Sequence, residues 1–447
     1  MLTRRLDRAR VAELLARLRS DEGIGDPYPI YAQLRALAPA MRVGRTDVVV
    51  THYRECAAVL RDGSFGARGA AWRDQQGQRG LDGQPWRDRP ALVELSKFML
   101  ACDPPEHTRL RDAFAAFFSP GRVRSLRPMV EQVVADVVAE FCTVLDACGT
   151  ADFVELVAAP LPMRVTGRLL GIPESDYPPL IPLLDEMSLA LGPAPAEGEL
   201  ARADQAALAL RDYMKDLLAD TSRGEDGSAL AAWTAAAGRG DALTRAEMAN
   251  AVPILFQAGS GTVRLMLGNL MNILTGSPEL VAQLREFPAL APRAADECAR
   301  LDAPTQMVSR VALRDAKVGD VQVRQGDSVH VMIGSANRDP RYFDHPDEAD
   351  LCRSGARPLS YSQGVHRCLG ATLGGTEITA LLPVLLGALG SWRFADSPVR
   401  FPSMSFRGFV TMPVTLCARV GGELHLTGTV AAGPATLSQQ RCAPDSI

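Results

Sequence analysis

The stretch that decides the fold is residues 361–370, which reads Tyr361-Ser362-Gln363-Gly364-Val365-His366-Arg367-Cys368-Leu369-Gly370. Gly364 permits a tight backbone turn, and the apolar run after the cysteine predicts a helix over 369–389. Cys368 then lies at a helix N-terminus, where the helix dipole favours the thiolate. Gly370 lets a flat, bulky group approach closely. The alternative is a buried structural cysteine beside a turn, so the rest of the chain has to decide.

Three further motifs carry chemistry. Glu297-Cys298-Ala299-Arg300 places an acid and an arginine three residues apart, on one face of a helix. Pro104-Pro105-Glu106-His107-Thr108-Arg109-Leu110-Arg111 places a histidine and an arginine four apart on another helix. Ala258-Gly259-Ser260-Gly261-Thr262 lies within an apolar helical stretch that runs from 251 to 274.

Together these motifs resemble the cytochrome P-450 superfamily, whose cysteine loop reads F-x-x-G-x-(H/R)-x-C-x-G. The chain matches it at Gly364, His366, Cys368 and Gly370, while Tyr361 replaces the phenylalanine. The loop also has a serine at 362, where a glycine is usual. The resemblance covers residues 25 to 416. It implies a mainly α fold with a minor β-sheet region, an α-rich triangular prism around a buried haem.

The cofactor implied by the resemblance is haem b, with the Cys368 thiolate as iron ligand and Tyr361, Gly364 and Gly370 shaping the loop beside it. Its two propionate carboxylates need hydrogen-bonded cations when they are partly buried. At the positions that the family uses for this purpose, the chain has His107, Arg111, Arg310 and His366.

The E-x-x-R residues carry a structural expectation. In the family they meet an arginine from the segment before the cysteine loop, where this chain has Arg353. Glu297, Arg300 and Arg353 are therefore expected to form a buried ion triad that fixes the fold around the haem and takes no part in catalysis.

The oxygen-binding helix departs from the family pattern A-G-x-(D/E)-T. Ala258, Gly259, Ser260 and Thr262 fit it, but Gly261 occupies the place of the acid. The family role of Thr262 is to hydrogen-bond dioxygen and hold a water for proton delivery. The alternative is an ordinary helical threonine bonded to the carbonyl four residues back. Without the acid, protons have to come through water, through Ser260 or from the substrate.

The substrate pocket is placed by position in the family alone, and each of its residues has ordinary core packing as an alternative. The expected lining residues are Phe98, Met99, Phe256, Gln257, Thr305, Val308, Phe409 and Val410.

Composition sets the frame for these motifs. The 447 residues are 47% hydrophobic and 22% charged with a formal net charge of −4, which is ordinary for a globular protein and gives no sign of nucleic-acid binding. We expect one domain over 1–420 and a small polar tail over 421–447. A strand is predicted at 48–50, a helix at 53–60, a long irregular segment at 66–95 and a small sheet around the Gly326-Asp327 turn.

The charged N-terminus predicts no signal peptide, and the 251–274 stretch contains too many polar residues for a membrane span. We therefore expect a cytoplasmic monomer. Nine scattered cysteines without CxxC pairs argue against a disulfide framework or a zinc site.

The resemblance implies a monooxygenase that activates dioxygen to hydroxylate, epoxidise or oxidatively couple a small organic substrate, free or carrier-bound, in bacterial secondary metabolism. Electrons from NAD(P)H would arrive through a ferredoxin and its reductase, with Arg109, Arg357 and Arg367 on the docking face. Two alternatives stay open: a peroxide-driven or radical-coupling enzyme, suggested by Gly261, and a haem protein that binds a ligand without turnover.

Overall fold

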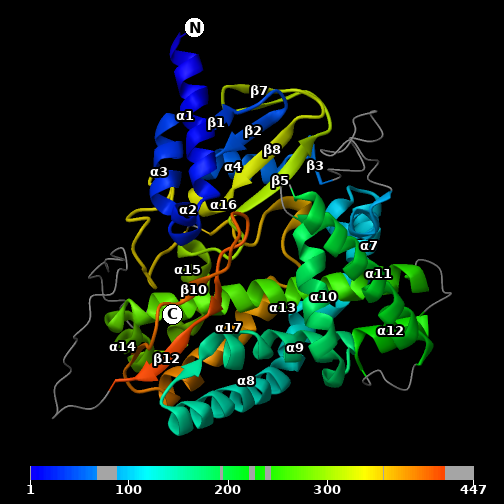
Figure 1. Cartoon of the computed structure of the whole chain (residues 1–447), viewed down its shortest axis with the longest axis vertical. Helices are drawn as coiled ribbons and strands as arrows, with labels where there is room; N and C mark the ends of the chain where they lie inside the picture. The colour runs from blue at the N-terminus through cyan, green and yellow to red at the C-terminus, as the bar shows by residue number, and fades with distance from the viewer. Residues whose placement is uncertain are drawn as a thin grey trace.

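The computed structural model describes residues 2–67, 88–191, 195–220, 227–236, 243–355 and 357–417, with side chains from residue 9 onward. Most of the chain forms a helical bundle, and a smaller part forms a sheet flanked by the N-terminal helices (Figure 1). The polar tail expected at 421–447 and residues 68–87 of the irregular segment lie outside the described residues.

The α-helices have these bounds: α1 Leu2–Leu18, α2 Asp21–Gly25, α3 Tyr28–Leu37, α4 Tyr53–Arg61, α6 Pro90–Ser96, α7 Glu106–Ala115, α8 Pro120–Cys148, α9 Pro160–Leu170, α10 Tyr177–Ser188, α11 Glu197–Ala219, α12 Ala229–Ala236, α13 Arg245–Thr275, α14 Pro278–Glu286, α15 Ala291–Leu301, α16 Ile333–Ala336 and α17 Ala371–Ala388. Short 3-10 turns include η2 Met99–Ala101 and η9 Gly364–His366, and a π-helical turn spans Val154–Ala158.

The strands have these bounds: β1 Ala40–Arg42, β2 Asp47–Val50, β3 Phe65–Gly66, β4 Ala151–Asp152, β5 Met307–Ala312, β6 Ala316–Val318, β7 Val321–Val323, β8 Ser328–Met332, β9 Trp392–Phe394, β10 Val399–Arg400, β11 Phe409–Thr411 and β12 Pro413–Leu416. The largest sheet has the order β1-β2-β8-β5-β3. Its β2–β8 pair is parallel, with Val49 opposite His330, and its other pairs are antiparallel.

The central helix α13 crosses the bundle (Figure 1). It begins in a reciprocal cap: the Thr244 hydroxyl accepts from the Glu247 N–H at 3.2 Å, and the Glu247 carboxylate accepts from the Thr244 N–H at 2.7 Å. This exchange satisfies backbone donors that a helix start otherwise leaves unpaired. The N-terminal half of α13 packs in one hydrophobic cluster with α10, α11 and α12. The C-terminal half of α13 packs in another cluster with α8, α9 and α17.

Apolar residues cover both faces of the main sheet. One face packs against α4, and the other packs against α1 and α3 through residues that include Leu14 and Leu34. Strand β2 therefore alternates between the two buried clusters, with Val48 and Val50 on one face and Val49 on the other. Of the helices described, only α17 is long and apolar enough to cross a membrane, and it packs here against α8 and α15.

The structure confirms the α-rich class with a minor sheet, together with the strand near 48–50 and the helices near 53–60 and 369–389. Two expectations were wrong in detail. The segment predicted to be irregular ends in the helix α6. The strands on either side of the Gly326-Asp327 turn do not pair with each other, because β7 pairs with β6 whereas β8 pairs with β2 and β5.

Candidate active site

The cysteine loop is held in shape by its own backbone. The Cys368 N–H donates to the Tyr361 carbonyl oxygen at 2.8 Å, and the Ser362 N–H donates to the Leu359 carbonyl oxygen at 2.8 Å. The loop then passes through η9 and leads into α17 at Ala371. Cys368 therefore lies just before a helix N-terminus, as the sequence predicts.

Two residues of this loop have left-handed backbone angles. Gly364 has φ +70°, and a Cβ there would collide with the Leu60 carbonyl oxygen of α4. Ser362 has φ +57°. Because an L-residue pays about 1–2 kcal/mol for the left-handed region, this angle explains why glycine is usual at position 362, and the serine is accommodated at some strain.

Opposing influences act on the Cys368 thiol. Desolvation by the surrounding protein raises its pKa, although the residue is exposed, while the N–H groups of Gly370 and Ala371 and the guanidinium groups of Arg111 and Arg367 act to lower it. A bound cation favours the deprotonated form of a coordinating thiol. This donor set therefore fits a thiolate that binds a metal ion and receives hydrogen bonds from the first turn of a helix.

A cluster of basic side chains lies beside the loop. The rings of His107 and His366 meet edge to face with centroids 4.4 Å apart, and His366 Nε2 lies 4.0 Å from Asp103 Oδ1. Arg310 is buried and its guanidinium donates to the Ser309 carbonyl oxygen at 3.0 Å. The structure thus brings these residues, far apart in sequence, into one place.

The cluster is incompletely paired. His107 Nδ1 and His366 Nε2 are buried without a hydrogen-bond partner. Burial, His366 and Arg111 together lower the pKa of His107 to about 4, and burial lowers the pKa of Arg310 to about 10. Each shift records a buried base that lacks a sufficient counter-charge. An anionic group with several acceptor oxygens fits this cluster, and the two carboxylates of haem are such a group.

On α13, Thr262 and Ala258 share one face. The Thr262 hydroxyl donates to the Ala258 carbonyl oxygen at 2.9 Å, which leaves the threonine oxygen able to accept a further hydrogen bond. Ser260 lies two residues before Thr262, about 200° around the helix. Its side chain is buried, and its hydroxyl donates to the Phe256 carbonyl oxygen at 2.7 Å. The Ser260 hydroxyl is therefore not on the Thr262 face.

The glycines of this motif stand against polar side chains. A Cβ at Gly259 would lie 2.7 Å from Thr166 Oγ1 of α9. A Cβ at Gly261 would lie 3.3 Å from Gln257 Nε2, within the same helix. Arg264 faces elsewhere: its guanidinium lies 3.8 Å from Asp185 Oδ1 and 5.9 Å from the centroid of the Phe401 ring.

The expected ion triad is confirmed. Arg300 donates to both carboxylate oxygens of Glu297, at 2.9 and 2.7 Å, and Arg353 Nε lies 3.2 Å from Glu297 Oε1. Glu297 and Arg300 are buried at 6% and 1% relative exposure, so the pair lies inside the protein.

The residues expected to line a pocket are distributed unevenly. Phe98, Phe256 and Phe409 are buried in hydrophobic clusters, and Phe409 packs against Gly268 in the C-terminal half of α13. Met99, Gln257, Thr305 and Val308 are partly buried, and Val410 is exposed.

The sequence interpretation missed Phe406. It forms an isolated antiparallel bridge with Thr305, so the 401–408 turn lies beside the segment before β5. No periodic signal marks this turn, because the contact joins irregular segments about a hundred residues apart.

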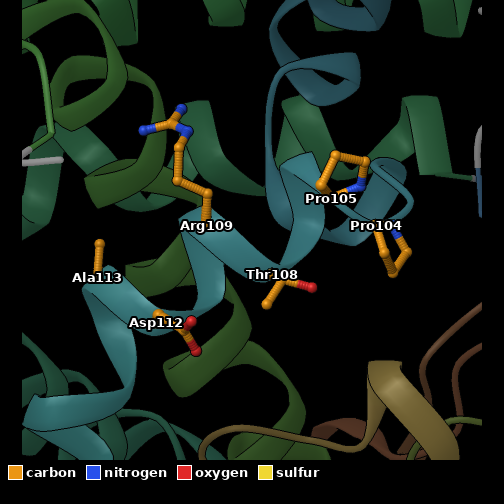
Figure 2. A pocket seen from close by; sticks show the side chains of 6 residues that line it. All are labelled: Pro104, Pro105, Thr108, Arg109, Asp112 and Ala113. Atoms are coloured by element: carbon orange, nitrogen blue, oxygen red, sulfur yellow. The ribbon is translucent and has the colours of Figure 1, made fainter.

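A surface hollow of about 880 Å³ lies along α7 and the prolines before it. Figure 2 shows the six described residues that line it: Pro104, Pro105, Thr108, Arg109, Asp112 and Ala113. Arg109 forms ion pairs with Glu106 and Glu247, whereas Arg357 and Arg367 are exposed. His107, Leu110 and Phe114 on the same helix are buried, so α7 separates the hollow from the basic cluster.

No group of three or more metal-ligating side chains occurs within the part of the chain that the structure describes. Seven cysteines there carry free thiols, and Cys352 is disulfide-bonded. The bridged Cys352 differs from the expectation that the cysteines form no disulfide.

Comparison with known proteins identifies relatives along nearly the whole chain. The family model described as Cytochrome P450 matches residues 290–413. Nocardicin C N-oxygenase of Nocardia uniformis subsp. tsuyamanensis is 34% identical over 405 residues, which cover 88% of this chain and 97% of that protein. Cytochrome P450 monooxygenase PikC of Streptomyces venezuelae is 32% identical over 399 residues, which cover 87% of this chain and 91% of that protein.

Solved structures give the same picture for the fold. P450BioI in complex with a hexadec-9Z-enoic acid ligated acyl carrier protein superposes with a TM-score of 0.80 at 29% identity, covering 89% of this chain and 100% of that chain. P450 RauA, complexed with a biosynthetic intermediate of aurachin RE, superposes with a TM-score of 0.75 at 27% identity, covering 91% of this chain and 100% of that chain.

Proposed function

The chain belongs to the cytochrome P450 family and is therefore a haem-thiolate monooxygenase, and we propose that it oxidises a small organic molecule of bacterial secondary metabolism with Cys368 as the iron ligand. The observation that carries the assignment of the ligand is the position of Cys368. It precedes α17, receives N–H groups from Gly370 and Ala371, and lies in the loop that also carries His366 of the basic cluster.

We further propose that His107, Arg111, Arg310 and His366 bind the haem propionates. The support is the two unpartnered buried ring nitrogens and the buried Arg310 guanidinium. When bound, haem supplies dioxygen activation, with thiolate ligation favouring cleavage of the O–O bond. The protein's own part is to bind and orient the group, keep bulk water out, and deliver protons beside Thr262.

The proton donor differs from the family pattern, because position 261 has no acid. Thr262 keeps an accepting oxygen on the exposed Ala258 face of α13. A substrate that carries a hydroxyl or amine near Thr262 can hold the relay water there. The substrate class is supported by relatives whose names include a nocardicin N-oxygenase and a P450 of a bacillaene polyketide synthase. A carrier-bound substrate has a precedent in the acyl carrier protein complex of P450BioI.

Electrons come from redox partners, for which we propose a ferredoxin and an NAD(P)H-dependent reductase. The exposed Arg357 and Arg367 present positive charge near the cysteine loop, and the hollow along α7 lies on the solvent side of the basic cluster. Such a surface complements an acidic protein. We place the enzyme in the cytoplasm, where these partners are available.

The reduced protein with carbon monoxide tests the ligand. The red-shifted Soret band of a thiolate-ligated haem should appear, and Cys368→His should abolish it while haem stays bound. Cys148→Ser, which alters an exposed free thiol at the end of α8, is the matched control and should leave the band unchanged. A Cys368→His protein that keeps the band would show that another residue is the ligand.

Gly261 favours a second candidate, a peroxide-driven enzyme. The two candidates differ in their oxidant: the monooxygenase needs dioxygen and reduced ferredoxin, whereas the peroxide-driven enzyme turns over rapidly with hydrogen peroxide alone. Arg264, the arginine nearest to Thr262 in sequence, does not support the peroxide-driven candidate, because its guanidinium lies near Asp185 and the Phe401 ring instead.

A further inference from the structure

The amide side chain of Gln257 occupies the place where an acid at position 261 would begin. A Cβ built on Gly261 lies 3.3 Å from Gln257 Nε2, 3.6 Å from Cδ and 3.9 Å from Oε1. Residues 257 and 261 are four apart and share a helix face, so the carboxamide covers this surface of α13. Glycine at 261 leaves room for the carboxamide.

A hydrogen-bonded chain fixes the orientation of this carboxamide. Ser188, the last residue of α10, donates its hydroxyl hydrogen to the Leu184 carbonyl oxygen at 2.8 Å. A serine hydroxyl has one hydrogen to donate, so it can only accept from Gln257. The Gln257 Nε2 accordingly donates to Ser188 Oγ at 2.8 Å. The amide nitrogen is thereby directed to α10, and Oε1 accepts no hydrogen bond from the side chains or backbone that the structure describes.

The free acceptor, Gln257 Oε1, lies 3.9 Å from the Cβ position of Gly261, the residue before Thr262. Thr262 follows Gly261 by one residue, about 100° around the helix. Its hydroxyl hydrogen is used on the Ala258 carbonyl, so its oxygen is also an acceptor. Gln257 Oε1 and Thr262 Oγ1 are thus two acceptors on adjacent sides of one helix. A water molecule suits them because it has two hydrogens to donate and typically makes about three hydrogen bonds in a protein interior.

We propose that Gln257, held by Ser188, takes over the positioning role of the missing acid by binding a water molecule next to Thr262. This inference rests on the proposed function, because it concerns delivery of protons for dioxygen reduction. A carboxamide does not titrate, so Gln257 is a positioning residue: it orients the water, and the proton itself comes from solvent through that water. The arrangement also ties α10 to α13 across the site.

The experiment uses the haem-loaded protein with a ferredoxin and its reductase in excess. Gln257→Leu removes both the anchor and the acceptor. It should slow NADPH-driven dioxygen consumption about tenfold, below the 10²–10⁴-fold typical of a general acid because water still reaches Thr262. It should also enlarge the solvent deuterium isotope effect. Gln257→Glu keeps an acceptor oxygen and should restore the rate.

Asn250→Leu is the matched control. Asn250 also lies on α13 and donates its amide to the Glu94 carbonyl oxygen at 2.7 Å, far from position 261 along the helix. It should change thermal stability but not the isotope effect. The double variant Gly261→Glu with Gln257→Ala installs an acid at the family position and removes the carboxamide that would collide with it. Its rate of dioxygen consumption should match that of the unaltered protein, unlike that of Gln257→Leu.

A high-resolution crystal structure of the resting protein gives a readout that does not depend on turnover. It should show a water within hydrogen-bond distance of both Gln257 Oε1 and Thr262 Oγ1, absent in Gln257→Leu. If no such water is present, or if Gln257→Leu matches Asn250→Leu in its isotope effect, the inference is wrong. Failure of the proposed function is distinguishable, because it would remove the thiolate Soret band from the unaltered protein as well.

Discussion

At the residue scale, two positions in this chain, Ser362 and Gly261, depart from their motif, and Gly259 follows it; a backbone angle or a neighbouring side chain bears on each. Ser362 takes a left-handed angle that suits glycine. Gly261 leaves space for the Gln257 carboxamide, and Gly259 leaves space for Thr166 of α9. At position 362 the backbone angle is the constraint, whereas at Gly259 and Gly261 a Cβ would lie 2.7 Å from Thr166 Oγ1 and 3.3 Å from Gln257 Nε2.

Gly259→Ala tests whether α13 and α9 are in close contact at Gly259. The new Cβ would lie 2.7 Å from Thr166 Oγ1 and 2.8 Å from Thr166 Cγ2, so α9 and α13 would have to separate. Overpacking of this kind costs about 1–3 kcal/mol. We expect a corresponding loss in the free energy of unfolding, measured by denaturant titration of the haem-loaded protein.

Thr166→Ala should rescue the Gly259→Ala protein. Thr166 Oγ1 is buried without a hydrogen-bond partner, so its removal sacrifices no hydrogen bond. Gly375→Ala in α17 is the control, since nothing lies within 4 Å of a Cβ there; it should be neutral or raise stability by about 0.5–1 kcal/mol. A Gly259→Ala protein as stable as the unaltered one would mean that the two helices are not tightly packed.

At the element scale, α15 organises the irregular segment that leads to the cysteine loop. Arg300 donates to the carbonyl oxygens of Asn337 at 3.0 Å, Pro346 at 2.5 Å and Glu348 at 2.8 Å, besides its bonds to Glu297. Arg353 donates to the Asp344 carbonyl oxygen at 2.6 Å. Two guanidinium groups thus gather carbonyl oxygens from this irregular segment, and both guanidinium groups share the carboxylate of Glu297.

Glu297→Ala should be strongly destabilising. It leaves Arg300, at 1% exposure, without its counter-charge, and breaking a buried pair by removing one partner costs about 3–5 kcal/mol. The expected result is a low yield of soluble protein with little bound haem, measured as haem absorbance per unit of protein.

The matched control is Glu131→Ala, which removes the partner of Arg127 on the exposed surface of α8, where the two side chains are 52% and 66% exposed. Exposed pairs contribute about 0–1 kcal/mol, so this variant should fold and bind haem normally. Equal behaviour of the two variants would show that the Glu297 triad is dispensable.

At the scale of the whole molecule, buried polar contacts join the N-terminal helices α2 and α3, which flank the sheet, to the end of α15 in the bundle. Asp302, just after α15, accepts from the Tyr28 hydroxyl at 2.6 Å and from Arg407 Nε at 2.5 Å. Arg407 in turn donates to the Ile24 carbonyl oxygen at 2.9 Å.

The bundle also contains a buried acid, Glu377 of α17. It is 1% exposed, and its Oε2 has no hydrogen-bond partner.

Glu377 should make global stability depend on pH. Burial raises its pKa well above the ordinary 4.5, so the folded protein keeps the carboxyl protonated where the unfolded chain ionises it. The unfolded state then binds fewer protons, and the free energy of unfolding falls as the pH rises from about 4.5 towards the folded-state pKa. Glu377→Gln removes this pH-dependent loss of stability, because an amide does not ionise. The difference in melting temperature between the variant and the unaltered protein should therefore shift in favour of the variant between about pH 5.5 and about pH 8.

Melting curves at several pH values check this prediction. Glu131→Gln on the surface of α8 serves as the control and should follow the unaltered protein at every pH. If the curves for Glu377→Gln and the unaltered protein run parallel across the range, Glu377 is already ionised in the folded state and has a partner there.

Much of the helical architecture was predictable from the sequence, because helix and strand periodicity is local. The capped start of α13, the strand β2 and the helix after Cys368 are each set by residues within a few positions. The ion triad was predictable through the family motif. The pairing of β8 with β2 was not, since strand partners are chosen by which apolar faces meet, and these two segments are nearly 300 residues apart.

The sequence by itself determined the family, the cysteine loop and the absence of an acid at position 261, because each is carried by residue types at fixed short spacings. Only the tertiary structure shows which side chain lies beside that position and how it is held. The Gln257 amide is oriented by Ser188 of α10, and Phe406 forms a bridge with Thr305. Hydrogen bonds and packing between elements set these outcomes, and the chain encodes them only through the complete fold.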